Sequence, residues 1–561
     1  MSTINKNSFV IVISTYIFSI LCWYLFSNGS PFLSLYENGL DNVLLNIIKS
    51  ESTARIRNLV VQLDQSFFKV MISFMLFITM CLLLLKSKKI IFSNNFYNFF
   101  NTEEFDAKKL KSNIYILIAV AAGLGLFLEL SIIRIHSSYF QLFAYFKNLS
   151  LLSCFLGLGI GYSFSKVKFY SLNWTFPIVV LQVSFMYLLK DTPVTLFFQN
   201  PISEIWNMGQ APAVGFIHIV LIYFFISVIF LLNAVAFVPL GHLVAKLMYN
   251  CDTLKAYSYD LIGAIFGIVI FTILSFIWTG PMVWLTISFT VLIYLQHNLN
   301  FNIKFNCLSF ILLALCLNTF NDSSKLDLHS PYQNVSVKFN TNQSAPITVQ
   351  SNNLWLQTPI NLSNKFYQDQ NISWHEFYTI PYASTKKNFK KILIVGSGTG
   401  NDVATALRNT NATIDAVEID PLVADLGIKF HPEQPYSNKR VKLTINDARN
   451  FIKETENKYD LIVYSLLDSH ANLSSKGGVR LDSYVYTAES FFEAKKKITD
   501  NGIIFLSFAI STEEMGNKIY KMLKMNFDQD PIILTSNDNP EKQNFTEGIY
   551  AFVVSDKNIY L

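Results

Sequence analysis

Charged residues are scarce in this chain and unevenly distributed. They make up 15% of the 561 residues, against about 25% in an average soluble domain. Residues 1–320 hold only 19 basic and 12 acidic side chains, whereas residues 321–561 hold 25 and 27. With 51% hydrophobic residues overall, this composition excludes a uniformly soluble globular protein and intrinsic disorder. We predict an α-helical membrane domain over 1–320, followed by a water-soluble part whose slight negative charge argues against nucleic acid as a partner.

Cysteine is absent after residue 316, and no CxxC pair occurs anywhere. The soluble part therefore has neither a disulfide nor a thiolate zinc site, and no metal site is predicted. The six cysteines lie in the first 320 residues, mostly within apolar runs, and we expect them to be buried as small apolar side chains. They are Cys22, Cys81, Cys154, Cys251, Cys307 and Cys316.

Eight apolar runs are long enough to span a bilayer as helices. They are residues 8–27, 67–85, 114–133, 148–165, 172–189, 214–238, 257–278 and 281–297. A ninth run, 305–319, is short, since 15 helical residues reach only about 22 Å. The lysine-rich loop 86–111 is expected to face the cytoplasm. Eight spans then place the soluble part in the cytoplasm, whereas nine, with 305–319 spanning, would place it outside. We predict eight, because the ligand inferred below is cytosolic, and an integral protein of the cell (inner) membrane.

Few ionisable side chains interrupt these runs, and each is expensive to bury in lipid. Glu129, Arg134 and Asp260 are therefore candidates for a functional role in the membrane, although a structural polar pair or an interfacial position would also explain them. Gly157, Gly159 and Gly161, with the Gly263–Gly267 pair, are better explained as close-packing positions between helices.

The second half changes from a small β-region and linker (321–389) to alternating strands and helices (390–561). Residues 391–396, TIDAVEI, VKLTI, YDLIVYS and GIIFLSFA are expected to be strands, and a long helix is expected at about 485–498. This alternation predicts a Rossmann-like, doubly wound and mostly parallel α/β sheet.

A glycine-rich turn, GSGTGND, follows the first of these strands. Glycines there let the backbone turn sharply and approach a ligand, and no GK[ST] follows, so the turn is not a P-loop. Glu418, at the end of the second strand, can accept hydrogen bonds from ribose hydroxyls. Asp447, after the third strand, can accept one from an adenine amino group, although it would also suit a helix N-cap. The set predicts a nucleoside pocket at the carboxyl edge of the sheet.

The order GxGxG, VEIDP, NDAR and YDLIV resembles the spermidine synthase family of aminopropyltransferases, within the wider class I methyltransferase group that uses S-adenosyl-L-methionine (AdoMet). SPYQNVSV and Trp374-His375-Glu376 resemble further family motifs, and LELSIIR, LGLGIGY, HPEQPY and RLDSYVYT resemble multi-pass membrane members. The resemblance implies AdoMet or decarboxylated AdoMet as the ligand. It assigns ligand binding to Gln333, Gly396, Gly398, Thr399, Gly400, Asp402, Glu418, Asp447 and Ala448. It also suggests substrate contacts for His375, Glu376, Arg480, Asp482 and Tyr484.

Three positions depart from the family pattern. Thr399 stands where the family has the aspartate that binds the aminopropyl amine, and a hydroxyl supplies no countercharge. Ser465 replaces the aspartate that helps to deprotonate the attacking amine, and Gln370-Asn371 replaces an acidic pair. Asp468 and His470 remain as candidate bases beside Ser465.

Three functions therefore stay open. The departures favour AdoMet-dependent methyl transfer by a membrane-tethered enzyme, with an amine or a lipid-soluble molecule as acceptor. The first alternative is aminopropyl transfer to a polyamine, with Asp468 as the base. The second is a membrane transporter whose soluble domain senses a nucleoside. The acceptor and the oligomeric state do not follow from the sequence.

Overall fold

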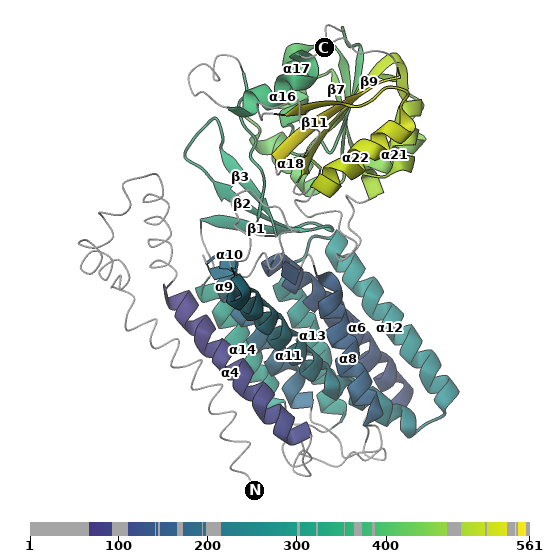
Figure 1. Cartoon of the computed structure of the whole chain (residues 1–561). Coiled ribbons are helices and arrows are strands. Elements are labelled where there is room, and N and C mark those ends of the chain that lie inside the picture. The colour runs from purple at the N-terminus through teal and green to yellow at the C-terminus, as the bar shows by residue number, and fades with distance from the viewer. Residues whose placement is uncertain are drawn as a thin grey trace, which may run out of the picture. The chain divides into compact units, whose positions relative to one another are not determined.

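The computed structural model separates the chain into two compact units, a helical one that ends at Asp322 and an α/β one that begins at Ser323. Figure 1 shows the helices and strands of both units. The structure describes residues 67–91, 110, 112–140, 142–143, 146–164, 172–192, 194–197, 215–299, 303–320, 324–352, 354–363, 373–383, 388–467, 484–510, 513–535, 545 and 548–556. The apolar run predicted at 8–27, most of the 86–111 loop and Gln370-Asn371 lie outside the described residues.

Long apolar helices make up the described part of the helical unit. They are α4 (Phe67–Ile91), α6 (Ile114–Tyr139), α8 (Lys147–Ser163), α9 (Thr175–Leu189), α11 (Gly215–Tyr249), α12 (Thr253–Phe276), α13 (Pro281–Asn298) and α14 (Lys304–Thr319), with short helices η2 (Leu172–Trp174) and α10 (Val194–Phe197). Five segments among the described residues are long and apolar enough to cross a membrane. They lie in α4, α6, η2–α9, α11 and α12 and correspond to five of the eight predicted spans. Of the other three, 8–27 lies outside the described residues, 148–165 forms the shorter apolar helix α8, and 281–297 lies in α13, which is not among the five.

Glycines bring two pairs of these helices into backbone contact. A Cβ atom at Gly157 or Gly161 of α8 would clash with the backbone of α11, at Ala234 and Val238. On α12, a Cβ at Gly263 would clash with Ala119 of α6. Gly159, by contrast, has nothing within 4 Å of its Cβ position, so the close-packing prediction is wrong for that glycine.

A four-stranded antiparallel sheet opens the α/β unit, in the order β1 (Lys325–His329), β2 (Asn334–Phe339), β3 (Ile347–Ser351) and β4 (Leu354–Gln357). Strand β1 was not predicted, although Lys-Leu-Asp-Leu-His alternates polar and apolar residues. The inward side chains of β2 and β3 pack in one cluster with Leu422, Val423 and Leu426 of helix α18 (Pro421–Phe430). The small sheet is therefore attached to the larger domain by a shared hydrophobic core.

The larger sheet has seven strands in the order β10-β11-β9-β8-β5-β6-β7. The five predicted strands form its parallel part: β5 (Lys391–Val395), β6 (Thr413–Glu418), β7 (Val441–Ile445), β8 (Tyr459–Tyr464) and β9 (Ile498–Ile510). Strands β10 (Ile532–Thr535) and β11 (Gly548–Val554) were not predicted, and β11 runs antiparallel to both of its neighbours, so the sheet is mixed.

Helices cover both faces of this sheet (Figure 1). Ile392 and Ile394 of β5 pack with α17 (Asn401–Asn409), whereas Leu393 and Val395 belong to the opposite core. That core includes α19 (Ala448–Glu454), α21 (Ala488–Lys496) and α22 (Glu513–Asn526), and α16 (Ser373–Ala383) and η3 (Pro435–Ser437) complete the unit. The α/β prediction is confirmed.

The long helix predicted at 485–498 is wrong at both ends. The side chain of Thr487 accepts a hydrogen bond from the Ser490 amide, so α21 begins only at Ala488. The helix ends at Lys496, because β9 already starts at Ile498 and pairs there with Tyr459 of β8.

Candidate functional site

The glycine-rich turn between β5 and α17 requires a backbone that only glycine adopts readily. Gly396, Gly398 and Gly400 have φ angles of 70°, 56° and 107°, in the left-handed region. A side chain at Gly396 would also clash with Leu467 after β8, and one at Gly398 with Gln357. The turn is therefore held tightly between the end of β8 and strand β4.

Glu418 fixes the other side of the turn. Its Oε2 accepts a hydrogen bond from the Gly398 amide at 2.9 Å, and its Oε1 accepts one from the Asp420 amide at 2.9 Å. Burial raises the pKa of this carboxyl, and the two backbone donors oppose that shift. Each carboxylate oxygen has a second lone pair, so the predicted bond to a ribose hydroxyl is compatible with these contacts.

Gln357 at the end of β4 is a site residue that was not predicted from the sequence. Its Oε1 accepts hydrogen bonds from both the amide and the hydroxyl of Thr399, at 2.7 and 2.9 Å. The hydroxyl of the fully buried Thr399 is thus engaged by the protein itself. No local signal marks Gln357, because it lies 42 residues away from its partner in the sequence.

Gln333 bridges the small sheet to the end of β6. Its Nε2 donates to Asp420 Oδ2 at 2.9 Å, and its Oε1 accepts from the Ser351 hydroxyl at 2.5 Å. The Ser330 hydroxyl also donates to Asp420 Oδ2, at 2.7 Å. Asp420 itself caps α18 through its other oxygen. These contacts give Gln333 a positioning role beside its predicted contact with the ligand.

Asp447 stands at the N-terminus of α19, immediately before the buried Ala448. Its Oδ1 accepts from the Asn450 amide at 2.9 Å, which makes it the N-cap of the helix. Asp447 Oδ1 therefore caps the helix, as the alternative in the sequence analysis expects. A contact between adenine and the other oxygen, Oδ2, remains a prediction.

Asp402 lies in the first turn of α17, at the point between β5 and β8 where the strand order reverses. Ligands of open α/β sheets bind at such a point. Burial raises the pKa of its half-buried carboxyl to about 6, and the Ser465 hydroxyl beside it partly offsets that shift. Its charge also acts on the phenol groups of Tyr378 and Tyr382 on α16. A carboxyl group therefore stands next to Ser465.

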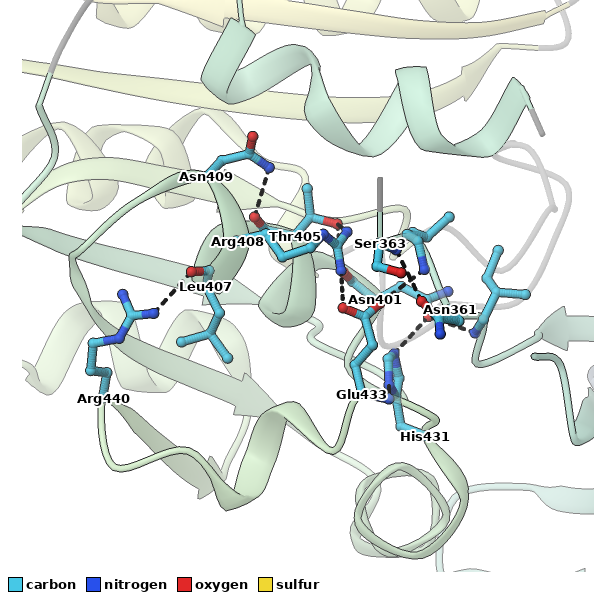
Figure 2. A network of polar contacts seen from close by, with 12 residues as sticks. Asn361, Ser363, Asn401, Thr405, Leu407, Arg408, Asn409, His431, Glu433 and Arg440 are labelled. Carbon is cyan, nitrogen blue, oxygen red and sulfur yellow. Dashed lines mark hydrogen bonds and ion pairs between the residues drawn. The ribbon is translucent and has the colours of Figure 1, made fainter. Parts of the chain in front are cut away.

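A network of polar contacts holds the segment before α16 onto α17 (Figure 2). The side chain of Asn401 is at the centre of this network. Its Nδ2 donates a hydrogen bond to Thr358 O, and its Oδ1 accepts one from the backbone amide of Ile360. The same Oδ1 lies 3.1 Å from His431 Nε2. His431 Nδ1 accepts from the Glu433 amide, so Nε2 carries the proton that it donates to Asn401.

The same network includes an ion pair. Glu433 pairs with Arg408, and its Oε1 accepts from the Leu362 amide at 2.9 Å. Burial and the Arg408 charge lower the pKa of His431 to about 3. Tyr436 also donates a hydrogen bond to Gly398 O at 2.7 Å. Residues of the HPEQPY motif therefore hold the glycine-rich turn in place.

Several predicted site residues cannot be placed in this way. Asp468, His470, Arg480 and Asp482 lie outside the described residues, and of His375 and Glu376 only their position on α16 is described. Tyr484 is exposed, and its carbonyl accepts from Arg449 Nη1 at 3.2 Å. Within the described part of the chain, no three His, Cys, Asp or Glu side chains gather as a metal site would require.

The family model of the spermine/spermidine synthase domain matches residues 373–535. The α/β unit contains a spermidine synthase-like domain. A polyamine aminopropyltransferase of Korarchaeum cryptofilum is 31% identical over 134 residues, which are 23% of this chain and 39% of that protein. One of Sulfurisphaera tokodaii is 34% identical over 135 residues, 23% of this chain and 42% of that protein. The chain thus spans about two fifths of the length of these relatives.

Among solved structures, a spermidine synthase from Thermotoga maritima aligns with a TM-score of 0.32 and 14% identity. The alignment covers 42% of this chain and 72% of that one.

Proposed function

We propose that the protein is a polyamine aminopropyltransferase that uses decarboxylated AdoMet and an amine acceptor. The departures at Thr399 and Ser465, taken alone, favour methyl transfer. The relatives that match the soluble part are, by name, polyamine aminopropyltransferases, and they support the aminopropyl alternative better.

The observation that carries this proposal is the position of Asp402. An aminopropyl donor presents a protonated amine, and a nearby carboxylate stabilises that charge. Asp402 supplies a carboxylate at the reversal of strand order, beside Ser465 and one helical turn after Thr399. The same charge would repel the carboxylate that AdoMet retains. The site therefore suits decarboxylated AdoMet better than AdoMet.

The transfer itself needs positioning and removal of one proton. The acceptor nitrogen attacks the propyl carbon next to the sulfonium, the C–S bond breaks, and the sulfur keeps the electron pair to give methylthioadenosine. The attacking amine must first lose its proton. Asp402 is assigned to the donor's amine, so Asp468, the base predicted from the sequence, would take this proton.

Product analysis tests this proposal on the full chain in detergent. With decarboxylated AdoMet and putrescine we expect methylthioadenosine and an aminopropylated amine, and with AdoMet we expect no turnover. S-adenosylhomocysteine as the product from AdoMet, without methylthioadenosine in the first reaction, would instead establish methyl transfer.

The helical unit is proposed to anchor the enzyme in the cell membrane, with the soluble part in the cytoplasm where its substrates occur. The five apolar segments long enough to span support this location. A lipid bilayer is the partner that we propose for the helical unit.

A further inference from the structure

In the glycine-rich turn, residues 396–400, the protein itself uses the backbone amides as donors. The amides of Gly396 and Ser397 both donate hydrogen bonds to Val417 O, at 2.8 and 3.0 Å. The Gly400 amide donates one to Ser397 O at 2.9 Å. These three bonds join backbone groups only, so the local path of the chain fixes them.

The other two amides of the turn depend on side chains. The Gly398 amide donates to Glu418 Oε2 at 2.9 Å. The Thr399 amide donates to Gln357 Oε1 at 2.7 Å. A backbone N–H can only donate, so the Gln357 atom that faces it must be the carbonyl oxygen and not the nitrogen. Every amide of the turn therefore has an acceptor inside the protein.

This arrangement differs from the glycine-rich turns that bind anions. Such turns present free backbone N–H groups to a phosphate or a carboxylate. Here an anion beside the turn would lose hydrogen bonds to water without gaining any from these amides. Helix α17 follows directly, and its first turn carries the acidic Asp402, whose charge repels an anion.

Gln357 also fills the space beside the two amides that depend on side chains. A Cβ atom built on Gly398 would clash with the Gln357 amide group, which therefore lies across both Gly398 and Thr399. Gln357 Oε1 accepts a second hydrogen bond from the Thr399 hydroxyl at 2.9 Å. Two bonds to one residue fix the side chain in this place.

We infer that Gln357 is a positioning residue that sets the specificity of the site, by excluding nucleosides with a carboxylate or phosphate beside the glycine-rich turn. It acts through the turn, because it occupies the Thr399 amide that such an anion would need as a donor. This inference rests on the proposed function and deepens it. It names the contact that separates decarboxylated AdoMet from AdoMet.

Binding of two unreactive thioethers to the full chain in detergent, measured by calorimetric titration, tests the inference. S-adenosylhomocysteine and its decarboxylated form differ only in the carboxylate, and neither has a sulfonium group. We expect the wild type to bind the decarboxylated form at least about tenfold more tightly, the scale of one charge-assisted hydrogen bond.

Gln357→Ala frees the Thr399 amide and leaves room for a carboxylate. We expect S-adenosylhomocysteine to bind this variant more tightly than the wild type. The ratio of the two Kd values should fall at least about fivefold, because the freed amide can donate only to the ligand that has a carboxylate.

Two further variants separate this role from a merely structural one. Gln357→Glu keeps an oxygen acceptor for the Thr399 amide, so it should keep the wild-type preference or increase it. Gln350→Ala makes the same truncation on the adjacent strand β3 and should leave both Kd values unchanged. Structural damage at position 357 would weaken both ligands together and leave their ratio as it is in the wild type.

An unchanged ratio in Gln357→Ala, or equal binding of the two thioethers by the wild type, would overturn the inference. Neither measurement involves turnover, so failure of the proposed function is seen separately. S-adenosylhomocysteine formed from AdoMet in the product analysis would refute aminopropyl transfer, whatever the ratio of the two Kd values.

Discussion

At the scale of single residues, the fold shifts the pKa values of two side chains near the glycine-rich turn, Asp402 and His431. Asp402 has a raised pKa and His431 a lowered one, and burial is the main cause in both cases. Asp402 belongs to α17, and His431 contacts Asn401 of the same helix. The two shifts have opposite consequences for stability, which makes them separable by experiment.

We predict that Asp402→Asn stabilises the protein at neutral pH while it impairs transfer. The folded-state pKa, about 6, exceeds the ordinary value of 3.8, so the contribution of Asp402 is favourable below pH 3.8 and is lost as the pH rises through 6. At pH 7.5 the free energy of unfolding should rise by about 1–2 kcal/mol, allowing for partial exposure. Urea unfolding at pH 7.5 and pH 4 measures the difference, which should vanish at pH 4.

The matched control is Asp425→Asn, which removes an exposed carboxylate paired with Lys429 on α18. It should change the free energy of unfolding by less than about 0.5 kcal/mol at either pH. No stabilisation of Asp402→Asn at pH 7.5 would show that the carboxylate is well solvated.

Through His431, a fall in pH should lower the free energy of unfolding, whereas through Asp402 a rise in pH lowers it. Its folded-state pKa of about 3 lies below the ordinary 6.5, so its stabilising contribution is complete above pH 6.5 and is lost as the pH falls towards 3. Between pH 7.5 and 5 this term should lower the free energy of unfolding by about 2 kcal/mol. His431→Gln, measured by urea unfolding over the same range, should lack that loss. An equal loss in both proteins would contradict the assignment.

At the scale of elements, the three glycines of α8 have different packing roles although they belong to one sequence motif. Gly157 and Gly161 contact the α11 backbone so closely that no side chain fits, whereas Gly159 between them meets nothing. The three glycines are spaced two residues apart, so 157 and 161 share a face of the helix and 159 points away from it. The sequence motif LGLGIGY does not distinguish these roles.

We expect Gly157→Ala and Gly161→Ala each to destabilise the helical unit, by about 1–3 kcal/mol, because overpacking forces the two helices apart. Gly159→Ala is the internal control and should leave the melting temperature in detergent unchanged or slightly raised. Equal effects at all three positions would mean that α8 and α11 do not pack as described.

At the scale of the whole molecule, the absence of cysteine after residue 316 offers a direct test of sidedness. A chain with its six cysteines changed to alanine and with Ser437→Cys carries one thiol, at an exposed position of the α/β unit. If this unit is cytoplasmic, a membrane-impermeant maleimide should label it only after cells are permeabilised. Labelling of intact cells would place the unit outside, as an odd number of spans requires.

The sequence alone determined what depends on neighbouring residues. The change in charge density near residue 320, the five parallel strands, the glycine-rich turn and the position of Glu418 all follow from short-range patterns. Boundaries were less accurate where a capping residue, such as Thr487, overrode the helical pattern. Strands β10 and β11 were not predicted, although they are neighbours in the chain and pair with each other.

Only the tertiary structure decided which distant groups meet. Gln357 reaches Thr399 across 42 residues, Asp402 comes to lie beside Ser465, and Asn233 reaches α8 from α11. Thr399 and Ser465, judged by position alone, offer no carboxylate, but the fold places the Asp402 carboxyl beside Ser465. No local pattern records this neighbour, because it depends on the distance between side chains in the folded chain.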